Sequence, residues 1–383
     1  MKSHDAIVIG AGPAGLATSR ELARRGVEHV VLERGEVAHS WANFYDSLTL
    51  HTGKHMSSLP GMRFPRSAPL FVPRPMFVEY LRRYAEHFAL PIRAGVEVRR
   101  VERVENGTVH WRVHTADTTL ECRSLVFATG IASNPRVADI PGRANFERAG
   151  GHIMHSATYR RPSELIGKRV LVVGVGNSGA EIASELARAG ARVTVSVRTG
   201  ANVVPRDIAG VPVQYLARVI RKLPRRARET VVAAIGRVVE KRRGPPVLPR
   251  PPYGPLDAIP IIGFNLVDAI REALVEVRGA PLCLTSHGAR FADGDANFDT
   301  VLLATGFTPA LAPLGQLVRT DTKGFALRKD RVVSVDQPAL FFVGHNYDAT
   351  GGLFNIGRDA MQAARSIPAS FALRPASGAS GGP

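Results

Sequence analysis

The stretch AIVIGAGPAGLATSRELARRGVEHVVLER, residues 6–34, decides the fold of this chain. Its first residues are uniformly apolar, which is typical of a strand buried on both faces of a parallel sheet. A glycine-rich turn follows, then helix-forming residues over 16–24, and then a second apolar strand, VVL, after Gly26. Strand, turn, helix and strand in this order predict one βαβ unit.

The glycine turn of this unit has the pattern of a dinucleotide fingerprint. Gly10 allows the tight turn out of the strand, Gly12 lets the backbone approach a pyrophosphate, and Gly15 lets the helix pack closely on the sheet. The free amides at the start of the helix would then face the diphosphate. Glu33 follows Gly15 by 18 residues, where a carboxylate accepts hydrogen bonds from ribose hydroxyls and repels a 2′-phosphate. The unit therefore predicts a site for a dinucleotide such as FAD or NAD.

The same pattern recurs in the middle of the chain. Residues 170–173 form an apolar strand, GVGNSG is the turn, residues 180–189 are helical, and residues 192–197 form the next strand. This unit ends on Arg198, which stands 19 residues after Gly179. A guanidinium at that position suits the 2′-phosphate of NADPH.

A second matched signal is the pair of segments FATG, residues 127–130, and LATG, residues 303–306. Each ends an apolar strand, and one follows each nucleotide unit. We therefore expect the chain to cross between domains at these points. The predicted fold is α/β, with two Rossmann-like dinucleotide-binding domains for FAD and NADPH, the second inserted in the first. The expected parts are residues 1–160 and 301–371 for FAD, residues 161–300 for NADPH with an insertion at 211–265, and a disordered tail at 372–383.

The composition is that of an ordinary globular protein, with 383 residues, 45% hydrophobic and 22% charged. The formal net charge of +17 is compatible with nucleic acid, an anionic membrane or anionic small molecules as partners. The two cysteines, Cys122 and Cys283, form no C-x-x-C motif, which argues against a dithiol redox centre and favours a cytoplasmic location. We expect no nucleic-acid binding, because no recognition motif is present. No segment reaches the roughly 18 apolar residues of a membrane span, and no metal site is predicted.

The most basic segment is residues 214–243, which hold ten Arg and Lys against two Glu. Apolar positions recur through this segment and make it amphipathic. Such a helix can lie on an anionic membrane. The alternative is the solvated face of a lid or of a helix that bridges domains. A proline-rich connector follows at residues 244–255.

Residues 39–61 form a polar and aromatic loop that carries Trp41 and His51. Loops of this composition often hold site residues, although a surface connection is equally compatible with it. The apolar spacing of residues 76–88 predicts a core-facing helix, and Asn106-Gly107 predicts a hairpin turn between two strands.

Together these motifs resemble those of class B flavin-dependent monooxygenases, in particular the plant YUCCA-type branch that converts indole-3-pyruvate to indole-3-acetate. The resemblance covers residues 6–364 and rests on seven motifs in the family's order. They are GAGPAG, SW-x3-YD-x-L-x-LH-x2-K (residues 40–54), FATG, G-x3-HS-x2-Y (residues 151–159), GVGNSG, VRTGANVVPRDIAG (residues 197–210) and LATGF-x-P (residues 303–309). Two positions depart from the family pattern: Ala149 stands where the linker signature has Phe, and His51 where animal-type members have Asn.

The resemblance implies FAD and NADPH as cofactors, a C4a-(hydro)peroxyflavin as the oxygenating species, and a small organic substrate with dioxygen as partners. It places Trp41 and His51 in the flavin pocket as catalytic residues, and His155 and Tyr159 in the linker that couples domain movement to NADP⁺ retention. The start of a helix at residues 351–355 would point at the flavin. The expected cofactor-binding residues are Gly10, Gly12, Pro13, Ala14, Gly15, Glu33, Arg34, Trp41, His51, Val98, Ala128, Thr129, Gly130, Gly174, Gly176, Asn177, Ser178, Gly179, Arg198, Ala304, Thr305, Gly306, Gly352 and Leu353.

Two alternatives stay open on the sequence. A YUCCA-like enzyme would attack the carbonyl of a 2-oxo acid such as indole-3-pyruvate, with loss of CO₂, whereas a general oxygenase would act on a soft nitrogen or sulfur. A chain with the same cofactors could instead be an NADPH-flavin reductase or oxidase that oxygenates no substrate, which Ala149 favours. The sequence does not determine the oligomeric state.

Overall fold

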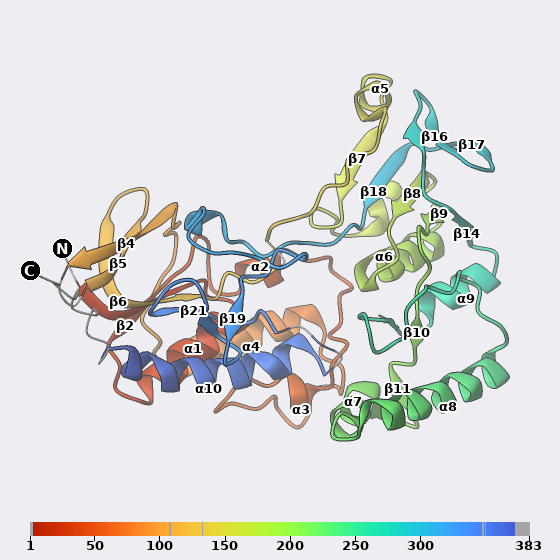
Figure 1. Ribbon diagram of the computed structural model, residues 1–383. Coiled ribbons are helices and arrows are strands. Elements are labelled where there is room, and N and C mark those ends of the chain that lie inside the picture. The colour runs from red at the N-terminus through yellow and green to blue at the C-terminus, as the bar shows by residue number, and fades with distance from the viewer. Residues whose placement is uncertain (1–2, 107–108, 132, 347, 349, 372–383) are drawn as a thin grey trace, which may run out of the picture.

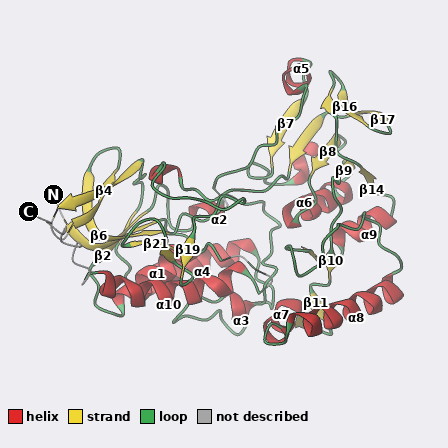
Figure 2. Cartoon of the chain, viewed as in Figure 1, coloured by secondary structure: helices red, strands yellow, loops and turns green. Residues whose placement is uncertain are grey.

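The computed structural model describes residues 3–106, 109–131, 133–346, 348 and 350–371. Two lobes lie side by side (Figure 1), each built on a mainly parallel sheet. The strands of the first lobe alternate in the chain with helices that cover one face of its sheet (Figure 2). The α/β class with two Rossmann-like domains is therefore confirmed.

The first sheet has the order β19-β20-β21-β6-β1-β2-β3, and β4 and β5 extend from β6 as an antiparallel meander. Strands β3, β2, β1, β6 and β21 are parallel, as a nucleotide-binding sheet requires. The strands are β1 (Ser3–Ile9), β2 (His29–Leu32), β3 (Ile92–Arg93), β4 (Arg100–Asn106), β5 (Val109–His114), β6 (Thr119–Phe127), β19 (Arg328–Lys329), β20 (Val333–Ser334) and β21 (Leu340–Phe342).

Alternate residues of β1 point to two different cores, which is why the strand is apolar throughout. Ala6 and Val8 pack into the core that contains the helices on one face, whereas Ile7 and Ile9 pack against the β4–β5 meander on the other. All four side chains are buried. The helices of this lobe are α1 (Pro13–Ala23), α2 (His39–Ala42), α3 (Lys54–Ser57), α4 (Arg74–His87) and α10 (Gly352–Ser370).

The second sheet has the order β14-β9-β8-β18-β7, and all its strands are parallel. Helices α6 and α9 pack into the core on one face, and α5 and a small three-stranded sheet pack on the other. The elements are α5 (Arg143–Arg148), β7 (His152–His155), β8 (Arg169–Val173), α6 (Asn177–Arg188), β9 (Arg192–Ser196), α9 (Asn265–Arg271), β14 (Val275–Arg278), β15 (Cys283–Leu284), β16 (Gly288–Phe291), β17 (Gly294–Asn297) and β18 (Thr300–Leu303). Short 3₁₀ turns lie at Pro162–Leu165 and Ala312–Leu314.

Strand membership corrects two of the predicted domain boundaries. The predicted boundary at 160/161 leaves β7 in the first domain, but β7 pairs with β18 in the second sheet. The boundary at 300/301 likewise cuts through β18, which pairs with β8 along its whole length. The sequence could not reveal this, because an edge strand such as β7 shows no pattern that tells which sheet it joins.

The two crossings between the lobes run side by side. Pro135 and Phe307 form an isolated antiparallel bridge. The Arg136 amide donates to the Gly306 carbonyl at 2.9 Å, and the Thr308 amide donates to the Asn134 carbonyl at 2.9 Å. The expectation that the chain crosses between domains next to FATG and LATG is therefore confirmed. Because the two linkers hydrogen-bond to each other, they form one double-stranded connection between the lobes, which we call the hinge.

The insertion folds as two helices below the second lobe (Figure 1), α7 (Val213–Ile220) and α8 (Arg225–Arg243). Pro224 separates them, since proline cannot continue a helix from the preceding turn. The remaining strands are β10 (Val203–Val204), β11 (Asp207–Ile208), β12 (Val211–Pro212) and β13 (Ile261–Ile262). Among the residues that the structure describes, no helix has the length and apolar character needed to cross a membrane. The tail predicted at 372–383 lies outside the described residues.

The ion pair between Arg169 and Asp299 fastens the start of β8 to the start of β18. One carboxylate oxygen accepts from the Arg169 amide at 2.8 Å, and the other accepts from the guanidinium at 2.6 Å. These hydrogen bonds lower the pKa of Asp299 to about 2. The folded-state value is below the usual value of about 3.9, so the charged pair stabilises the fold above pH ~4 and the contribution is lost as the pH falls towards 2.

We predict that Asp299→Asn lowers the unfolding free energy at pH 7 by about 1 kcal/mol, a figure reduced for the partial solvent exposure of the pair. The difference between wild type and variant should shrink between pH ~4 and pH ~2, where the wild-type carboxylate takes up its proton. Thermal unfolding across this pH range measures it. A difference that stays constant, or grows as the pH falls, would contradict the assignment.

Candidate functional site

The glycine turn after β1 has the geometry of a phosphate cradle. Gly10 has φ of +103°, a conformation that side chains other than glycine rarely adopt. A Cβ at Gly15 would lie 1.7 Å from the Gly10 carbonyl oxygen, so the helix start can approach the turn only without a side chain. A Cβ at Gly12 would meet nothing within 4 Å. Protein atoms therefore pack tightly against Gly10 and Gly15, whereas the space beside Gly12, in front of the first amides of α1, is open.

The turn after β8 repeats this geometry. Gly174 has φ of +100°, and a Cβ at Gly179 would lie 2.1 Å from the Gly174 carbonyl oxygen. Gly176 has open space on its Cβ side. Each nucleotide unit thus has one glycine with positive φ, one glycine whose missing side chain allows a close backbone contact, and one glycine beside open space. An anionic diphosphate fits both turns.

The two ATG segments pack against these turns. The ideal Cβ of Gly10 would lie 2.7 Å from the Ala128 carbonyl oxygen, and that of Gly174 would lie 2.7 Å from the Ala304 carbonyl oxygen. The Thr129 hydroxyl donates to the Ala310 carbonyl at 2.9 Å, and the Thr305 hydroxyl donates to the Arg136 carbonyl. Gly130 and Gly306 both have positive φ, at +66° and +83°. These residues shape the turns and the hinge.

Glu33 lies at the end of β2, next to the first turn, and only 8% of its surface is exposed. Its carboxylate accepts hydrogen bonds from the Ala11 amide at 2.7 Å and the Gly35 amide at 3.0 Å. These bonds fix the carboxylate beside the turn, and each oxygen retains a lone pair for a ribose hydroxyl. Arg34 is exposed, whereas Val98 is buried in the meander core.

The second unit places its predicted residues differently. Arg198 is exposed just after β9, where a cation is free to meet a phosphate. Asn177, at the first turn of α6, instead holds the insertion. Its side-chain amide donates to the Pro260 carbonyl at 3.2 Å, and its oxygen accepts from the Ile262 amide at 2.8 Å. Ser178 is half-buried beside it.

Trp41 is half-buried in α2 and packs edge-on against Phe77 of α4, with ring centroids 4.6 Å apart, and against Phe44 at 5.5 Å. These contacts anchor the loop to the first core. His51 is among the residues that line the cavity described below, and Trp41 is not.

His51 instead takes part in an interdomain cluster that the sequence did not reveal. Its Nε2 lies 3.1 Å from the Glu181 carboxylate on α6, and the Tyr45 hydroxyl donates to the same carboxylate. Burial raises the pKa of Glu181, but the hydrogen bonds from His51 and Tyr45 and the charge of Arg206 outweigh it, so the net pKa is lowered. The ionised carboxylate of the second lobe is thus held by two side chains of the first.

The linker residues lie at the same interdomain boundary. The Tyr159 hydroxyl donates to Glu185, one turn after Glu181, at 2.9 Å. The His155 ring packs edge-on against Phe307 of the returning linker, with centroids 5.2 Å apart, and its Nδ1 accepts from the Ala157 amide at 3.0 Å. Burial lowers the pKa of His155, which keeps the ring neutral. Tyr159 therefore connects the first linker to α6, and His155 connects it to the returning linker.

The start of α10 adjoins the His51 loop. A Cβ at Gly351, which has φ of +100°, would lie 2.7 Å from the Thr52 hydroxyl. Asn355 is fully buried, and its amide donates to the Asp348 carboxylate at 3.0 Å. Gly352 is half-buried at the first position of the helix, and Leu353 is buried. The partial positive end of α10 therefore opens beside Thr52 and His51.

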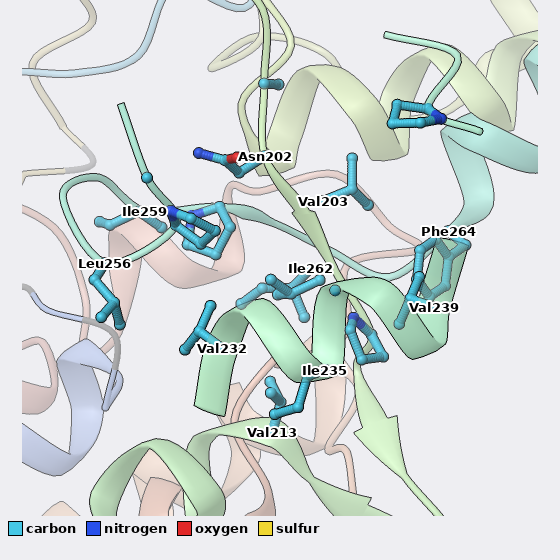
Figure 3. Close-up of a pocket in the computed structure, with 18 of the residues that line it drawn as sticks. Asn202, Val203, Val213, Val232, Ile235, Val239, Leu256, Ile259, Ile262 and Phe264 are labelled. Carbon is cyan, nitrogen blue, oxygen red and sulfur yellow. The ribbon is translucent and has the colours of Figure 1, made fainter. Parts of the chain in front are cut away.

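A cavity of about 810 Å³ connects these parts. Its wall includes His51, Thr52 and the start of α10 from the first lobe, and Asn177 from the second fingerprint. The insertion forms most of the rest of the wall. Figure 3 shows Val232, Ile235 and Val239 of α8 at this cavity, with Val203 and Ile262 also among its lining residues.

Two fingerprint turns on separate parallel sheets are the arrangement of an oxidoreductase with two dinucleotide sites, and the cavity reaches the second turn at Asn177. The chain matches the pyridine nucleotide-disulphide oxidoreductase family over residues 7–238. It is 35% identical over 313 residues to the indole-3-pyruvate monooxygenase YUCCA1 of Oryza sativa subsp. japonica, an alignment that covers 79% of this chain and 76% of the relative. The chain therefore belongs to the flavin-dependent monooxygenases of this oxidoreductase family, among which it is similar to the YUCCA type.

Solved structures agree with this assignment. A flavin-containing monooxygenase from Stenotrophomonas maltophilia is 25% identical, with a TM-score of 0.74 over 96% of this chain and 99% of that one. OTEMO, solved in complex with FAD and NADP, is 20% identical, with a TM-score of 0.72 over 96% of this chain and 86% of that one, and shows the same fold. The two cysteines of this chain are both free, so the disulphide chemistry in the family's name has no dithiol here.

We predict that Gly15→Ala and Gly12→Ala separate packing from binding. Gly15→Ala forces a Cβ into the Gly10 carbonyl and should lower the unfolding free energy by more than about 3 kcal/mol. Gly12→Ala meets no protein atom and should fold normally, but its methyl group would occupy the space of the diphosphate and weaken FAD binding about tenfold or more. Thermal unfolding and FAD titration of the apoprotein measure the two effects. Equal loss of stability in both variants would contradict this geometry.

A second prediction concerns the Glu181 cluster. Glu181→Gln removes the charge that His51 and Tyr45 share, and we expect a loss of about 1–3 kcal/mol in unfolding free energy. Glu79, exposed on α4, offers a matched control because Glu79→Gln removes an acid away from this boundary. Urea unfolding followed by tryptophan fluorescence compares the two variants. If Glu181→Gln is as stable as Glu79→Gln, the cluster does not hold the lobes together.

Proposed function

We propose that this protein is an FAD- and NADPH-dependent monooxygenase in which FAD binds at the first fingerprint and NADPH at the second. The proposal rests on one observation: the two glycine turns have the same pattern, but the first βαβ unit ends on the acidic Glu33 and the second on the basic Arg198. The cofactors of the family are FAD and NADPH, and bound flavin, once reduced, supplies the activation of dioxygen.

The residues present fit these two groups. Open space above Gly12 and Gly176 leaves room for a diphosphate against the first amides of a helix. The Glu33 carboxylate, already oriented by two backbone amides, would accept ribose hydroxyls of FAD. The exposed Arg198 would pair with a 2′-phosphate.

The roles of the remaining residues follow from their positions. The start of α10 would stabilise negative charge on the reduced flavin through its partial positive end. His51, fixed by Glu181, would hold a proton at Nε2 or Nδ1 beside the substrate cavity. His155 and Tyr159 would transmit movement of the hinge to α6. The free cysteines support a reducing, cytoplasmic location.

The relatives named indole-3-pyruvate monooxygenases make that 2-oxo acid the first substrate to test. A thioether such as methyl phenyl sulfide tests the alternative, oxygenation of a soft sulfur. Purified enzyme should oxidise NADPH and incorporate ¹⁸O from ¹⁸O₂ into product. Full conversion of the consumed oxygen to hydrogen peroxide with every substrate, and no ¹⁸O in any product, would instead support a reductase or oxidase.

We predict that Arg198→Gln raises the KM for NADPH about tenfold to a hundredfold and leaves the KM for NADH unchanged, because only NADPH carries the 2′-phosphate. Arg192→Gln is the matched control, since Arg192 is exposed at the opposite end of β9. Initial rates with both nucleotides measure the ratio. An equal rise in both KM values, or the same change in the control, would show that Arg198 does not recognise the phosphate.

A further inference from the structure

The insertion forms one side of the main cavity rather than a separate surface. Helix α7 contributes Leu216 and Ile220, and α8 contributes Val232, Ile235 and Val239. Leu256 and Ile259, which follow the proline-rich connector, and Phe264 also line the cavity (Figure 3). Apolar positions of the basic helix therefore face the cavity, and of its cations only Arg237 and Arg243 are among the lining residues.

The insertion is fastened to both lobes, so the cavity is a built site. The Asn177 amide clamps the backbone at Pro260 and Ile262. On the first lobe, the Tyr215 hydroxyl lies 2.8 Å from His55 Nδ1, and the Arg218 guanidinium lies over the Phe354 ring at 4.9 Å. The start of the insertion is thus attached to the first lobe, and its end is attached to the second. Phe354, which Arg218 contacts, lies on α10, the helix whose start adjoins Thr52.

The charges around the cavity are largely neutralised by one another. Arg250 pairs with Glu240 at 2.8 Å, and Arg243 pairs with Asp268 at 2.7 Å. Arg271 donates to the Pro245 carbonyl at 2.8 Å. Since these cations already have partners, they offer little attraction to a substrate carboxylate, whereas apolar side chains supply most of the wall. Arg237 is an exposed cation among the lining residues.

Resting on the proposed function, we infer that the physiological substrate is an uncharged molecule with a large apolar body, which lies beneath α8 with its reacting end at His51 and the start of α10. A cavity of about 810 Å³ accepts a ligand of drug size, well beyond a bicyclic 2-oxo acid. The insertion acts as the wall that shields this body from water. Ile235 and Val239 set the space that is available to it.

A tryptophan in place of Ile235 or Val239 fills part of the cavity, and Val238 offers a matched control. Ile235→Trp and Val239→Trp add bulk beneath α8, whereas Val238, 53% exposed, points away from the cavity. The probe is Nile red, an uncharged apolar dye, titrated into the FAD-loaded enzyme and followed by fluorescence. We expect saturable binding that weakens about tenfold or more in the two filling variants and is unchanged in Val238→Trp. FAD content and thermal midpoint verify that each variant folds.

A competition arm addresses the substrate class directly. Dodecyl phenyl sulfide should displace Nile red at lower concentration than indole-3-pyruvate does. Tighter competition by indole-3-pyruvate, lost in Arg237→Ala, would overturn the inference in favour of a carboxylate substrate. Dye binding that is insensitive to filling, or equally sensitive in Val238→Trp, would also overturn it. These measurements need no turnover, so absence of NADPH oxidation would refute the proposed function separately.

Discussion

The structure depends on a close backbone contact at two places, where the end of a strand packs against a glycine turn. A Cβ placed on Gly10 would lie 2.7 Å from the Ala128 carbonyl oxygen, and a Cβ placed on Gly174 would lie 2.7 Å from the Ala304 carbonyl oxygen. Any side chain at either glycine would separate the strand from the turn. Because each strand then continues directly into a linker, the same contact positions both the phosphate cradle and the hinge. Cofactor binding and domain geometry are thus set by one constraint.

Two sets of contacts join the lobes: the hinge, and the side chains that contact Glu181 and Glu185 of α6. The two linkers are hydrogen-bonded to each other through their backbones, which fixes where the lobes can pivot. The side chains of His51, Tyr45 and Tyr159 reach across to acids of α6, and these contacts can break without disturbing either sheet. An arrangement of strong backbone contacts at the pivot and weaker side-chain contacts elsewhere suits an enzyme whose two nucleotides must meet.

The insertion supplies most of the wall of the cavity, through α7, α8 and the proline-rich connector. The strong basic charge of α8 is understood from this position. Its apolar residues Val232, Ile235 and Val239 line the cavity, and its cations Arg225 and Arg243 pair with the acids Glu229 and Asp268. The basic charge of α8 does not by itself identify an anionic partner.

The sequence by itself determined the two nucleotide units, because a glycine fingerprint, its flanking strands and its terminal charge are all local. It also located both crossings between the lobes, since FATG and LATG end their strands visibly. Only the tertiary structure decided that β7 and β18 join the second sheet, that Asn177 holds the insertion, and that His51 faces Glu181. Each of these depends on residues far apart in the chain that meet after folding. No local pattern records which carboxylate will lie opposite a histidine, or which cavity an amphipathic helix will cover.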